Sequence, residues 1–454
     1  MKQELTQGNV QKTMLLFAGP MILGNLLQQC YNIADTLIVG HFLGAGALAA
    51  VGSAYTLMTF LTSVLIGLCM GSGSVWSFYY GKGDMEKLRD SVLSSFLFIC
   101  AVSLVMNILV FAGLDWILVV LKTPAALMRM MREYVFAIFW GIFFVFLYNY
   151  FAFLLRAMGN SVAPLWFLGA ASVLNIVLDL LFVVVFDWGI EGAAVATVIA
   201  QAMSGAGIGI YTWIRIRKMI FVPADPYKPV QKKGGRWQGI CEAAPEIIKF
   251  SLSSSIQQSV MNFGILMIQG LVNSFGTAVM AAFAAAVKID SFAYMPAQEF
   301  ANAFSIFISQ NYGAGKKERV QQSVRDSFRT SVIFCILISV LVFLLAPYLM
   351  MIFISPSETE IIRIGTEYLR IEGACYCGIG ILFLLYGYYR GVGKPEMSVV
   401  LTVISLGTRV VLAYALAPVM GVVAIWIAIP IGWLLADVTG VVYGRLWTSR
   451  WRFE

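Results

Sequence analysis

The chain has 454 residues, of which 60% are hydrophobic and only 12% are charged, and its formal net charge is +7. A soluble globular protein is nearer half apolar and a quarter charged, so a chain of this composition cannot cover itself with polar surface. Apolar runs as long as the ~20 residues that a helix needs to cross a bilayer recur along the whole sequence. This excludes a soluble domain with a single anchor and predicts a polytopic helical membrane protein.

Twelve apolar segments are predicted to span the membrane. In chain order they are 13–41, 46–78, 91–114, 132–155, 161–186, 189–214, 246–273, 278–310, 328–354, 364–389, 397–417 and 421–446. The first segment has no small-residue cleavage site after it, so it is interpreted as a span and not as a signal peptide. Several segments exceed the required length, and we expect their helices to tilt or to extend beyond the bilayer.

The basic residues indicate which side of the membrane each loop occupies. If the amino terminus is inside, 24 of the 31 Lys and Arg residues fall on inner segments, 5 on outer segments and 2 within spans. Basic residues collect on the cytoplasmic side of membrane proteins. We therefore predict a multi-pass protein of the plasma membrane with both termini in the cytoplasm. The positive charge then faces the lipid bilayer surface, and nucleic acid is not an expected partner.

The sequence also predicts two similar halves. Residues 215–245 are the most polar stretch and are interpreted as a cytoplasmic linker between an amino-terminal lobe, 1–214, and a carboxy-terminal lobe, 246–454. Four short patterns recur in the same order at offsets of 229 to 234: Gln28-Gln29 with Gln257-Gln258, Tyr80-Gly81 with Tyr312-Gly313, Glu133-Tyr134 with Glu367-Tyr368, and Arg156-x-x-Gly159 with Arg390-x-x-Gly393. Six spans per half give both halves the same orientation, an arrangement suited to alternating access.

Four polar residues of the first half are predicted to lie at a similar depth in the outer part of the bilayer. Asp35 is near the outer end of the first span, Asn175 and Asp179 are one helical turn apart on the fifth, and Thr197 is on the sixth. A charge inside the membrane costs ~3 kcal/mol on insertion scales, so it usually faces a cavity or a partner. Two carboxylates, an amide and a hydroxyl can hold Na⁺ or share a proton, and separate helix-to-helix hydrogen bonds are the structural alternative.

Other polar residues within spans are weaker candidates. Lys288 and Asp290 are two residues apart and do not face one another along a helix, so each is expected to pair elsewhere, with Glu299 or Arg409 as candidates, in a structural or a substrate-binding role. The candidate lining of a substrate cavity comprises Gln28, Asn32, Asn149, Gln258, Asn262, Lys288 and Asp290. Pro20 lies in the same span as Asp35 and is a candidate hinge, because proline bends helices.

The sequence carries no sign of an enzyme. It contains no phosphate-binding GKS or GKT loop, no cluster with metal-ligand spacing and no nucleophile triad. The seven cysteines lie mostly in apolar runs and are interpreted as reduced packing residues. No cofactor is expected apart from the coupling ion, H⁺ or Na⁺, and the chain is expected to act as a monomer.

Over nearly its whole length the chain resembles the multidrug and toxic compound extrusion (MATE) family. The resemblance rests on Pro20 and on the segments LQQCYNIADTLIVG (27–40), RAMGNSVAP (156–164), QNYGAGKKERV (310–320) and RGVGKPEMS (390–398). It implies a twelve-helix antiporter with two lobes that exports mostly cationic, amphipathic compounds in exchange for protons or sodium.

The resemblance also implies roles for particular residues. One branch of the family carries an aspartate on helix 1, an Asn-x-x-x-Asp on helix 5 and a threonine on helix 6. Those positions correspond here to Asp35, Asn175, Asp179 and Thr197. In that branch helix 1 bends at a proline that matches Pro20, and polar residues matching Gln28 and Asn149 face the cavity. A second branch uses acidic residues on helices 7 and 10, and the middles of the corresponding spans are interpreted as lacking acids, which favours the first branch.

Two alternatives stay open at this point. A lipid-linked oligosaccharide flippase of the same superfamily would commonly have fourteen helices and an arginine-rich cavity. A membrane scaffold or receptor would not require two carboxylates at matched depth on different helices.

Overall fold

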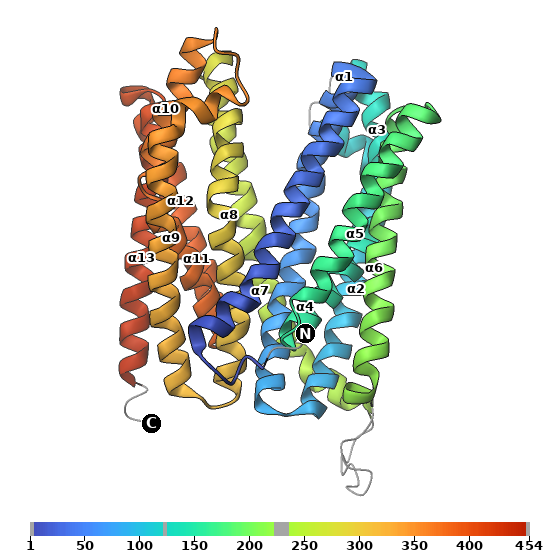
Figure 1. Ribbon diagram of the computed structural model, residues 1–454, viewed down its shortest axis with the longest axis vertical. Helices are drawn as coiled ribbons and strands as arrows, with labels where there is room; N and C mark the ends of the chain where they lie inside the picture. Colours follow the sequence, from blue (N-terminus) through green and yellow to red (C-terminus); the bar gives the residue numbers. More distant parts are fainter. Residues whose placement is uncertain (1–3, 121–124, 222–235, 451–454) are drawn as a thin grey trace, which may run out of the picture. The chain divides into compact units, whose positions relative to one another are not determined.

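The computed structural model describes residues 4–120, 125–221 and 236–450. These residues are nearly all helical, and no strand occurs among them. The long apolar runs explain this, because a backbone that crosses a bilayer has to satisfy its polar groups within its own helix. Figure 1 shows the helices running for most of their length along one direction within each half.

The helices of the first half follow the predicted spans closely. They are α1 (Val10–Lys82), α2 (Met85–Val120), α3 (Ala125–Phe139), α4 (Ile142–Ala157), α5 (Val162–Asp179) with the π-helix η1 (Leu180–Val185), and α6 (Gly189–Phe221). The first two predicted spans are joined in α1, which changes direction at Gly44 (φ 82°, ψ −179°). Only glycine adopts this conformation at low cost, so Gly44 separates two membrane-length helices, Val10–Gly44 and Gly46–Lys82.

The second half repeats this pattern. Its helices are α7 (Arg236–Asn273), α8 (Thr277–Gly313), α9 (Lys317–Met351), α10 (Thr359–Gly373), α11 (Tyr376–Gly391), α12 (Pro395–Met420) and α13 (Val423–Arg450). The bounds of α10 and α11 are those of α3 and α4 shifted by 234 residues. Both pairs are also bent, by 43° between α3 and α4 and by 52° between α10 and α11. The repeat seen in short sequence patterns is therefore a repeat of whole helices.

Each predicted span corresponds to a helix or a bent helix pair. Among the described residues, nine helices are long and apolar enough to cross a membrane, and the two bent pairs bring the number to eleven. The remaining predicted span lies in α7. This helix is long enough to cross a membrane, but its serines and the pair Gln257-Gln258 make it less apolar than the other spans. The architecture is that of an all-α membrane protein with two pseudo-symmetric six-span bundles.

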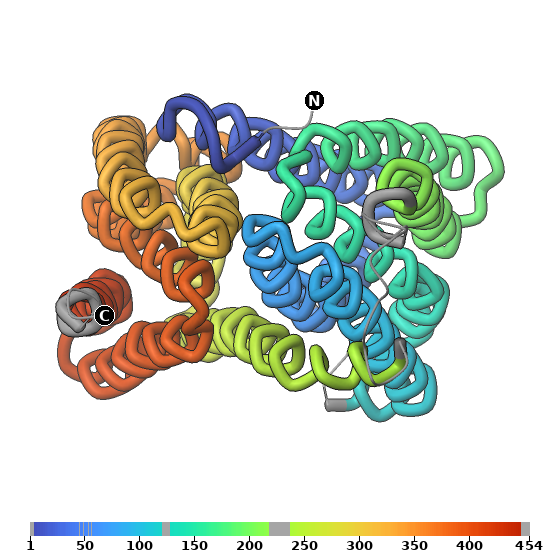
Figure 2. The backbone as a smooth tube through the Cα atoms, turned by 90° about the horizontal axis from the view of Figure 1, so that it is seen from below, coloured from blue at the N-terminus to red at the C-terminus, as the bar shows by residue number. Residues whose placement is uncertain are grey.

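Packing divides the chain into two units. The first consists mainly of Gly19–Ser255, and the second of Leu5–Ala18 together with Ile256–Glu454. Compared with the lobes predicted from the sequence, the start of α1 packs in the second unit and the start of α7 packs in the first. Within the second unit, α8 packs against α9, α10 and α11, and α12 packs along α13 (Figure 2).

Polar contacts fix both exchanged segments. In the first unit, the hydroxyls of Ser72 and Ser251 are 2.8 Å apart, and the Ser255 hydroxyl donates to the Val64 carbonyl at 3.1 Å. In the second unit, the Arg319 guanidinium donates to the carbonyls of Leu5, Gln7 and Gly8 at 2.6–3.3 Å. Pro20 thus lies beside the point, between Ala18 and Gly19, at which α1 passes from one unit to the other.

Candidate ion-coupling site

The four residues predicted to form an ion site come together in the first unit. Asp35 lies on α1, Asn175 and Asp179 on α5, and Thr197 on α6. Asp179 is 0% exposed and Asn175 only 1%. The carboxyl groups of Asp35 and Asp179 lie in hydrogen-bonding contact with each other. The depth argument from the sequence therefore identified residues that are neighbours in space.

Asn175 connects Asp179 to α6. In the amide orientation that satisfies both of its ends, Asn175 Nδ2 donates to Asp179 Oδ2 at 3.2 Å and its oxygen accepts from the Thr197 backbone N–H at 3.3 Å. The Thr197 hydroxyl is also 3.3 Å from this oxygen, and it donates to the Ala193 carbonyl at 3.0 Å. The four-residue spacing of Asn175 and Asp179 puts both side chains on one face of α5, which makes this bridge geometrically available.

The helix changes form directly after Asp179. Residues Leu180–Val185 form a π-helix, in which hydrogen bonds run from i to i+5 and the turn is wider. Such turns are rare and are found frequently at functional sites. Here the wider turn begins directly after the residue that bears the buried carboxyl.

The site holds more negative charge than its protein neighbours balance. None of the ion pairs within the described ranges involves Asp35 or Asp179. One oxygen of each carboxyl, Oδ1, is buried and has no hydrogen-bond donor in the described part of the chain. Asp35 is partly buried and Asp179 fully buried, and two carboxyls in contact there cannot both stay ionised without a counter-charge. The pair therefore requires a shared proton or a metal cation.

The available atoms fit either ion. Carboxylate, amide and hydroxyl oxygens are hard ligands of the kind that alkali and alkaline-earth cations prefer. Transition metals are usually held by clusters of His, Cys, Asp or Glu side chains. Among the described residues, no group of three or more such side chains could hold a metal ion.

Two tyrosines near the site were missed by the sequence interpretation. Tyr31, one turn before Asp35 on α1, and Tyr134, buried on α3, both interact electrostatically with Asp35 and Asp179. Tyr31 has the four-residue spacing that could have revealed it, and Tyr134 belongs to the Glu-Tyr pattern that repeats in the second half. Tyrosine is common in membrane proteins, so neither signal identifies a site by itself.

The candidate cavity residues of the first half differ in exposure. Gln28 is exposed, whereas Asn32 and Asn149 are partly buried. Asn32 Nδ2 donates to Gln29 Oε1 at 3.2 Å, and Asn149 Nδ2 donates to the Val145 carbonyl at 2.8 Å. These bonds lie within single helices, so they leave the cavity role of the three residues a prediction.

The candidates of the second half fall into two groups. Gln258 and Asn262 are partly buried on α7, and Lys288 is exposed with its Nζ 5.9 Å from the centre of the Phe353 ring. Asp290 is instead buried, at 4% exposure, and Arg409 acts on it electrostatically. Lys288 and Asp290 thus have separate surroundings, as their spacing predicted.

One interpretation of the second half was wrong. The middle of the predicted span 364–389 was taken to lack acids, but Glu372 is only 2% exposed and lies in the last turn of α10, beside the bend to α11. The span consists of two helices, so a residue that looked close to its start lies at its break. The second half therefore also contains buried carboxyls.

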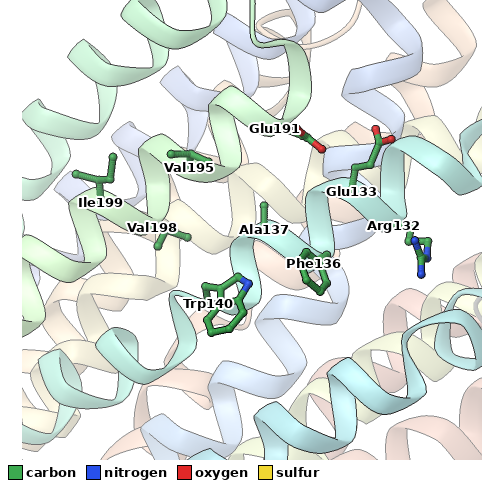
Figure 3. A pocket seen from close by; sticks show the side chains of 9 residues that line it. All are labelled: Arg132, Glu133, Phe136, Ala137, Trp140, Glu191, Val195, Val198 and Ile199. Atoms are coloured by element: carbon green, nitrogen blue, oxygen red, sulfur yellow. The ribbon is translucent and has the colours of Figure 1, made fainter.

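A cleft of about 430 Å³ opens on the side of the first unit. Figure 3 shows Glu133 and Glu191 near one end, with the apolar side chains of α3 and α6 beyond them. Phe136 and Trp140, which line it, are exposed. The cleft is a separate feature from the carboxyl pair, because none of its lining residues belongs to that site.

The comparisons with known proteins match most of the chain to one family. The MatE family model matches the chain twice, over residues 20–181 and 252–415. The chain is 31% identical over 454 residues to the probable multidrug resistance protein YpnP of Bacillus subtilis, covering 99% of this chain and 97% of that protein. It is 24% identical over 446 residues to the probable multidrug resistance protein NorM of Thermotoga maritima, covering 96% and 91%.

Solved structures show the same fold. A MOP superfamily transporter from Pyrococcus furiosus, reported with a binding pocket of reverse polarity, has a TM-score of 0.88 at 23% identity and covers 99% of this chain and 98% of that one. A multidrug resistance MATE family transporter in an outward-facing conformation gives a TM-score of 0.88 at 22% identity, covering 99% and 98%. A family model matches both halves, and the fold is shared with MATE transporters over the full length. This chain therefore belongs to the MATE family of membrane transporters.

Proposed function

We propose that the protein is a secondary active efflux transporter that exports amphipathic, mostly cationic small molecules in antiport with H⁺ or Na⁺. The observation that carries the proposal is the contact between the partly buried Asp35 and the fully buried Asp179, which needs a cation to be stable. The names of the relatives from Bacillus subtilis and Thermotoga maritima, both called probable multidrug resistance proteins, support the export of drugs. We further propose a monomer in the plasma membrane with both termini in the cytoplasm.

The carboxyl pair offers a direct coupling mechanism. With a proton or Na⁺ bound, Asp35 on α1 is held against Asp179 on α5. When the ion leaves, two like charges face each other in a low dielectric and repel strongly. Loss of the ion therefore drives α1 away from α5, and Pro20 gives α1 a place to bend. An outward-facing state would take up the ion and release substrate, and the inward return would carry the ion.

Of the two ions, we favour the proton. In the amide orientation that satisfies both of its ends, Asn175 Nδ2 points at Asp179, where a metal cation would need a ligand oxygen. This arrangement suits a carboxyl pair that shares a proton. Sodium would require Asn175 to turn its oxygen towards the ion.

The test is ethidium efflux from proteoliposomes under pH and sodium gradients imposed separately. We expect efflux to follow the pH gradient, and Asp35→Asn and Asp179→Asn to abolish coupled efflux while the protein still folds. Asp115→Asn is the matched control, because Asp115 forms an exposed ion pair with Arg132 at 2.8 Å and lies outside the site. Full efflux by both site variants would contradict the proposal, and efflux driven by sodium alone would reassign the ion.

A further inference from the structure

The cleft on the side of the first unit divides into a charged end and an apolar length. Arg132, Glu133 and Glu191 form the charged end (Figure 3). Beyond it the lining is apolar and consists of Phe136, Ala137, Trp140, Val195, Val198 and Ile199. Such a division matches a molecule that has a polar head and an apolar chain, because pockets fix their ligands with a few polar groups and hold the rest by apolar contact.

Helical periodicity produces both walls of the cleft. Lining residues recur every four positions, which places them on one helix face: Arg132, Phe136 and Trp140 in and directly after α3, and Glu191, Val195 and Ile199 on α6. On each wall the last of these residues is eight positions beyond the charged end, which is ~12 Å of helix. One leaflet of a bilayer contains about 15 Å of hydrocarbon, so the apolar length fits the depth of one leaflet.

The open side of the cleft faces away from the carboxyl pair. Phe136, Trp140 and Ile199 are 51%, 60% and 40% exposed. Tyr134 and Thr197 alternate with the lining residues along the same two helices, but they are buried and interact with the carboxyl site instead. Exposed apolar side chains on a membrane span contact lipid. A molecule that fills the cleft therefore comes from the bilayer.

The charged end carries both signs, and one of its acids forms no ion pair within the described ranges. Arg132 Nε pairs with Asp115 Oδ1 at 2.8 Å, and Arg129 Nε pairs with Glu133 Oε1 at 2.8 Å. Glu191 is exposed and is in none of the ion pairs, although Arg129 acts on it electrostatically. A cationic group is thus the complement to Glu191. Each arginine also has N–H donors besides Nε, and such donors bind phosphate well.

A zwitterionic phospholipid with a primary amine combines these properties. Its ammonium group complements Glu191 and donates hydrogen bonds to the carboxylate, which a quaternary ammonium cannot do. Its phosphate complements Arg129 and Arg132. An anionic lipid without an amine would bring a second negative charge to Glu191, and a cationic drug would leave the two arginines without an anionic partner group from the ligand.

The internal repeat indicates that the helical scaffold does not require an acid at this position. At the offset of 234, α13 corresponds to α6, and the counterpart of Glu191 is Ile425, which is 0% exposed. The next residue, Trp426, is buried and stacks on Phe283. The equivalent place in the second unit is therefore occupied by packed apolar side chains. The exposed Glu191 is a property of the first unit alone within this pair of positions.

From this geometry we propose that the cleft between α3 and α6 binds a bilayer phosphatidylethanolamine molecule, with its ammonium group at Glu191, its phosphate at Arg129 and Arg132, and an acyl chain beside Phe136 and Trp140. The inference goes beyond the proposed efflux function, because no residue of the carboxyl pair lines the cleft. With the topology proposed above, the lipid belongs to the outer leaflet, although binding itself does not depend on that orientation.

The test is native mass spectrometry of the full-length protein titrated with dioleoyl phosphatidylethanolamine and, separately, with dioleoyl phosphatidylglycerol. We expect the first phosphatidylethanolamine molecule to bind several-fold more tightly than the following ones and than phosphatidylglycerol. Glu191→Gln is expected to weaken this first binding step by about fivefold, the upper range for an exposed ion pair. Glu360→Gln is the matched control, because Glu360 is an exposed acid in the first turn of α10 in the second unit.

A second pair of variants tests the apolar length. Ala137→Trp fills the cleft and is expected to remove the first binding step, whereas Val173→Trp enlarges a side chain that is 64% exposed on α5 and leaves it in place. Equal affinity for the two lipids, or equal effects of Glu191→Gln and Glu360→Gln, overturns the proposal. Displacement of the first lipid by ethidium, one for one, would also overturn it and assign the cleft to a drug. Lipid binding is measured without transport, so its failure and a failure of coupled efflux are distinguishable.

Discussion

Individual side chains in the first unit have distinct tasks around the carboxyl pair. Asp35 and Asp179 carry the charge, and Asn175 holds Asp179 in place through contacts to α6. The sequence revealed Asp35, Asn175, Asp179 and Thr197 because charged and amide groups are conspicuous in apolar runs. It did not reveal Tyr31, Tyr134 or Glu372. Tyrosines have ordinary roles in membranes, and Glu372 stands in a stretch whose bend is invisible before the helices pack.

Asn175 provides a test at the scale of one residue. Asn175→Ala removes the hydrogen bond to Asp179 and the contact with Thr197. A hydrogen bond to a charged group contributes about 1.5–3 kcal/mol, so we expect the ion concentration needed for half-maximal transport to change by about tenfold or more. The measurement is the ion dependence of ethidium efflux in proteoliposomes.

The control for this variant is Asn273→Ala. Asn273 is exposed at the end of α7, in the second unit, and accepts a hydrogen bond from Gln269 Nε2 one turn earlier, so its loss is expected to leave the ion dependence unchanged. An Asn175→Ala protein with the ion dependence of the unchanged chain would show that the amide does not support Asp179.

At the scale of helices, close backbone contact joins α1 to the start of α7. A Cβ atom on Gly71 would lie 2.2 Å from the Phe250 carbonyl oxygen, and one on Gly67 would lie 2.5 Å from the Ser255 Cα. Neither position can accommodate a side chain, because the atoms that a Cβ would meet belong to the α7 backbone and cannot adopt another rotamer. Small residues at such crossings are typical of helix packing in membranes.

Gly71 tests this packing. Gly71→Ala forces α1 and α7 apart, and we expect it to lower the free energy of unfolding by about 1–3 kcal/mol, the usual cost of overpacking. Thermal unfolding of the purified protein measures the effect. Gly169→Ala on α5 is the control, since its added Cβ meets nothing within 4 Å. Equal midpoints for the two variants would contradict the tight crossing.

Pro20 tests the bending of α1. Pro20→Ala restores a backbone N–H and straightens the helix beside the point at which it changes units. We expect efflux to slow while proton uptake by the Asp35–Asp179 pair persists, because the site itself is fifteen residues away in sequence. Parallel measurements of uptake and efflux check this expectation, and loss of both together would instead place Pro20 in the ion site.

At the scale of the whole chain, each unit contains a segment that the sequence assigns to the other. The second unit holds Leu5–Gly8 through Arg319 and through Lys316, whose Nζ donates to the Thr6 carbonyl at 2.7 Å. The exchange ties the start of the chain to the end of the repeat loop at 310–320. Both α1 and α7 therefore contain residues of each unit, since the chain changes units at Ala18/Gly19 and at Ser255/Ile256.

Arg319 tests this attachment. Arg319→Ala removes the hydrogen bonds to Leu5, Gln7 and Gly8, so we expect the amides of residues 5–8 to exchange with solvent at least several-fold faster. Hydrogen exchange with mass spectrometry measures it. Arg325→Ala is the control, because Arg325 is an exposed residue on the same helix. Unchanged protection in Arg319→Ala would mean that packing and not the guanidinium holds the segment.

The sequence by itself determined the membrane class, the twelve spans, the repeat and the four residues of the carboxyl site. These follow from local properties: the length of apolar runs, the recurrence of short patterns, and the cost of a charge in a lipid environment. Only the tertiary structure decided that Asp35 touches Asp179, that the starts of α1 and α7 exchange units, and that Glu372 is buried beside the bend between α10 and α11. Those facts depend on which helix faces pack together, and contacts between distant residues leave no periodic trace along the chain.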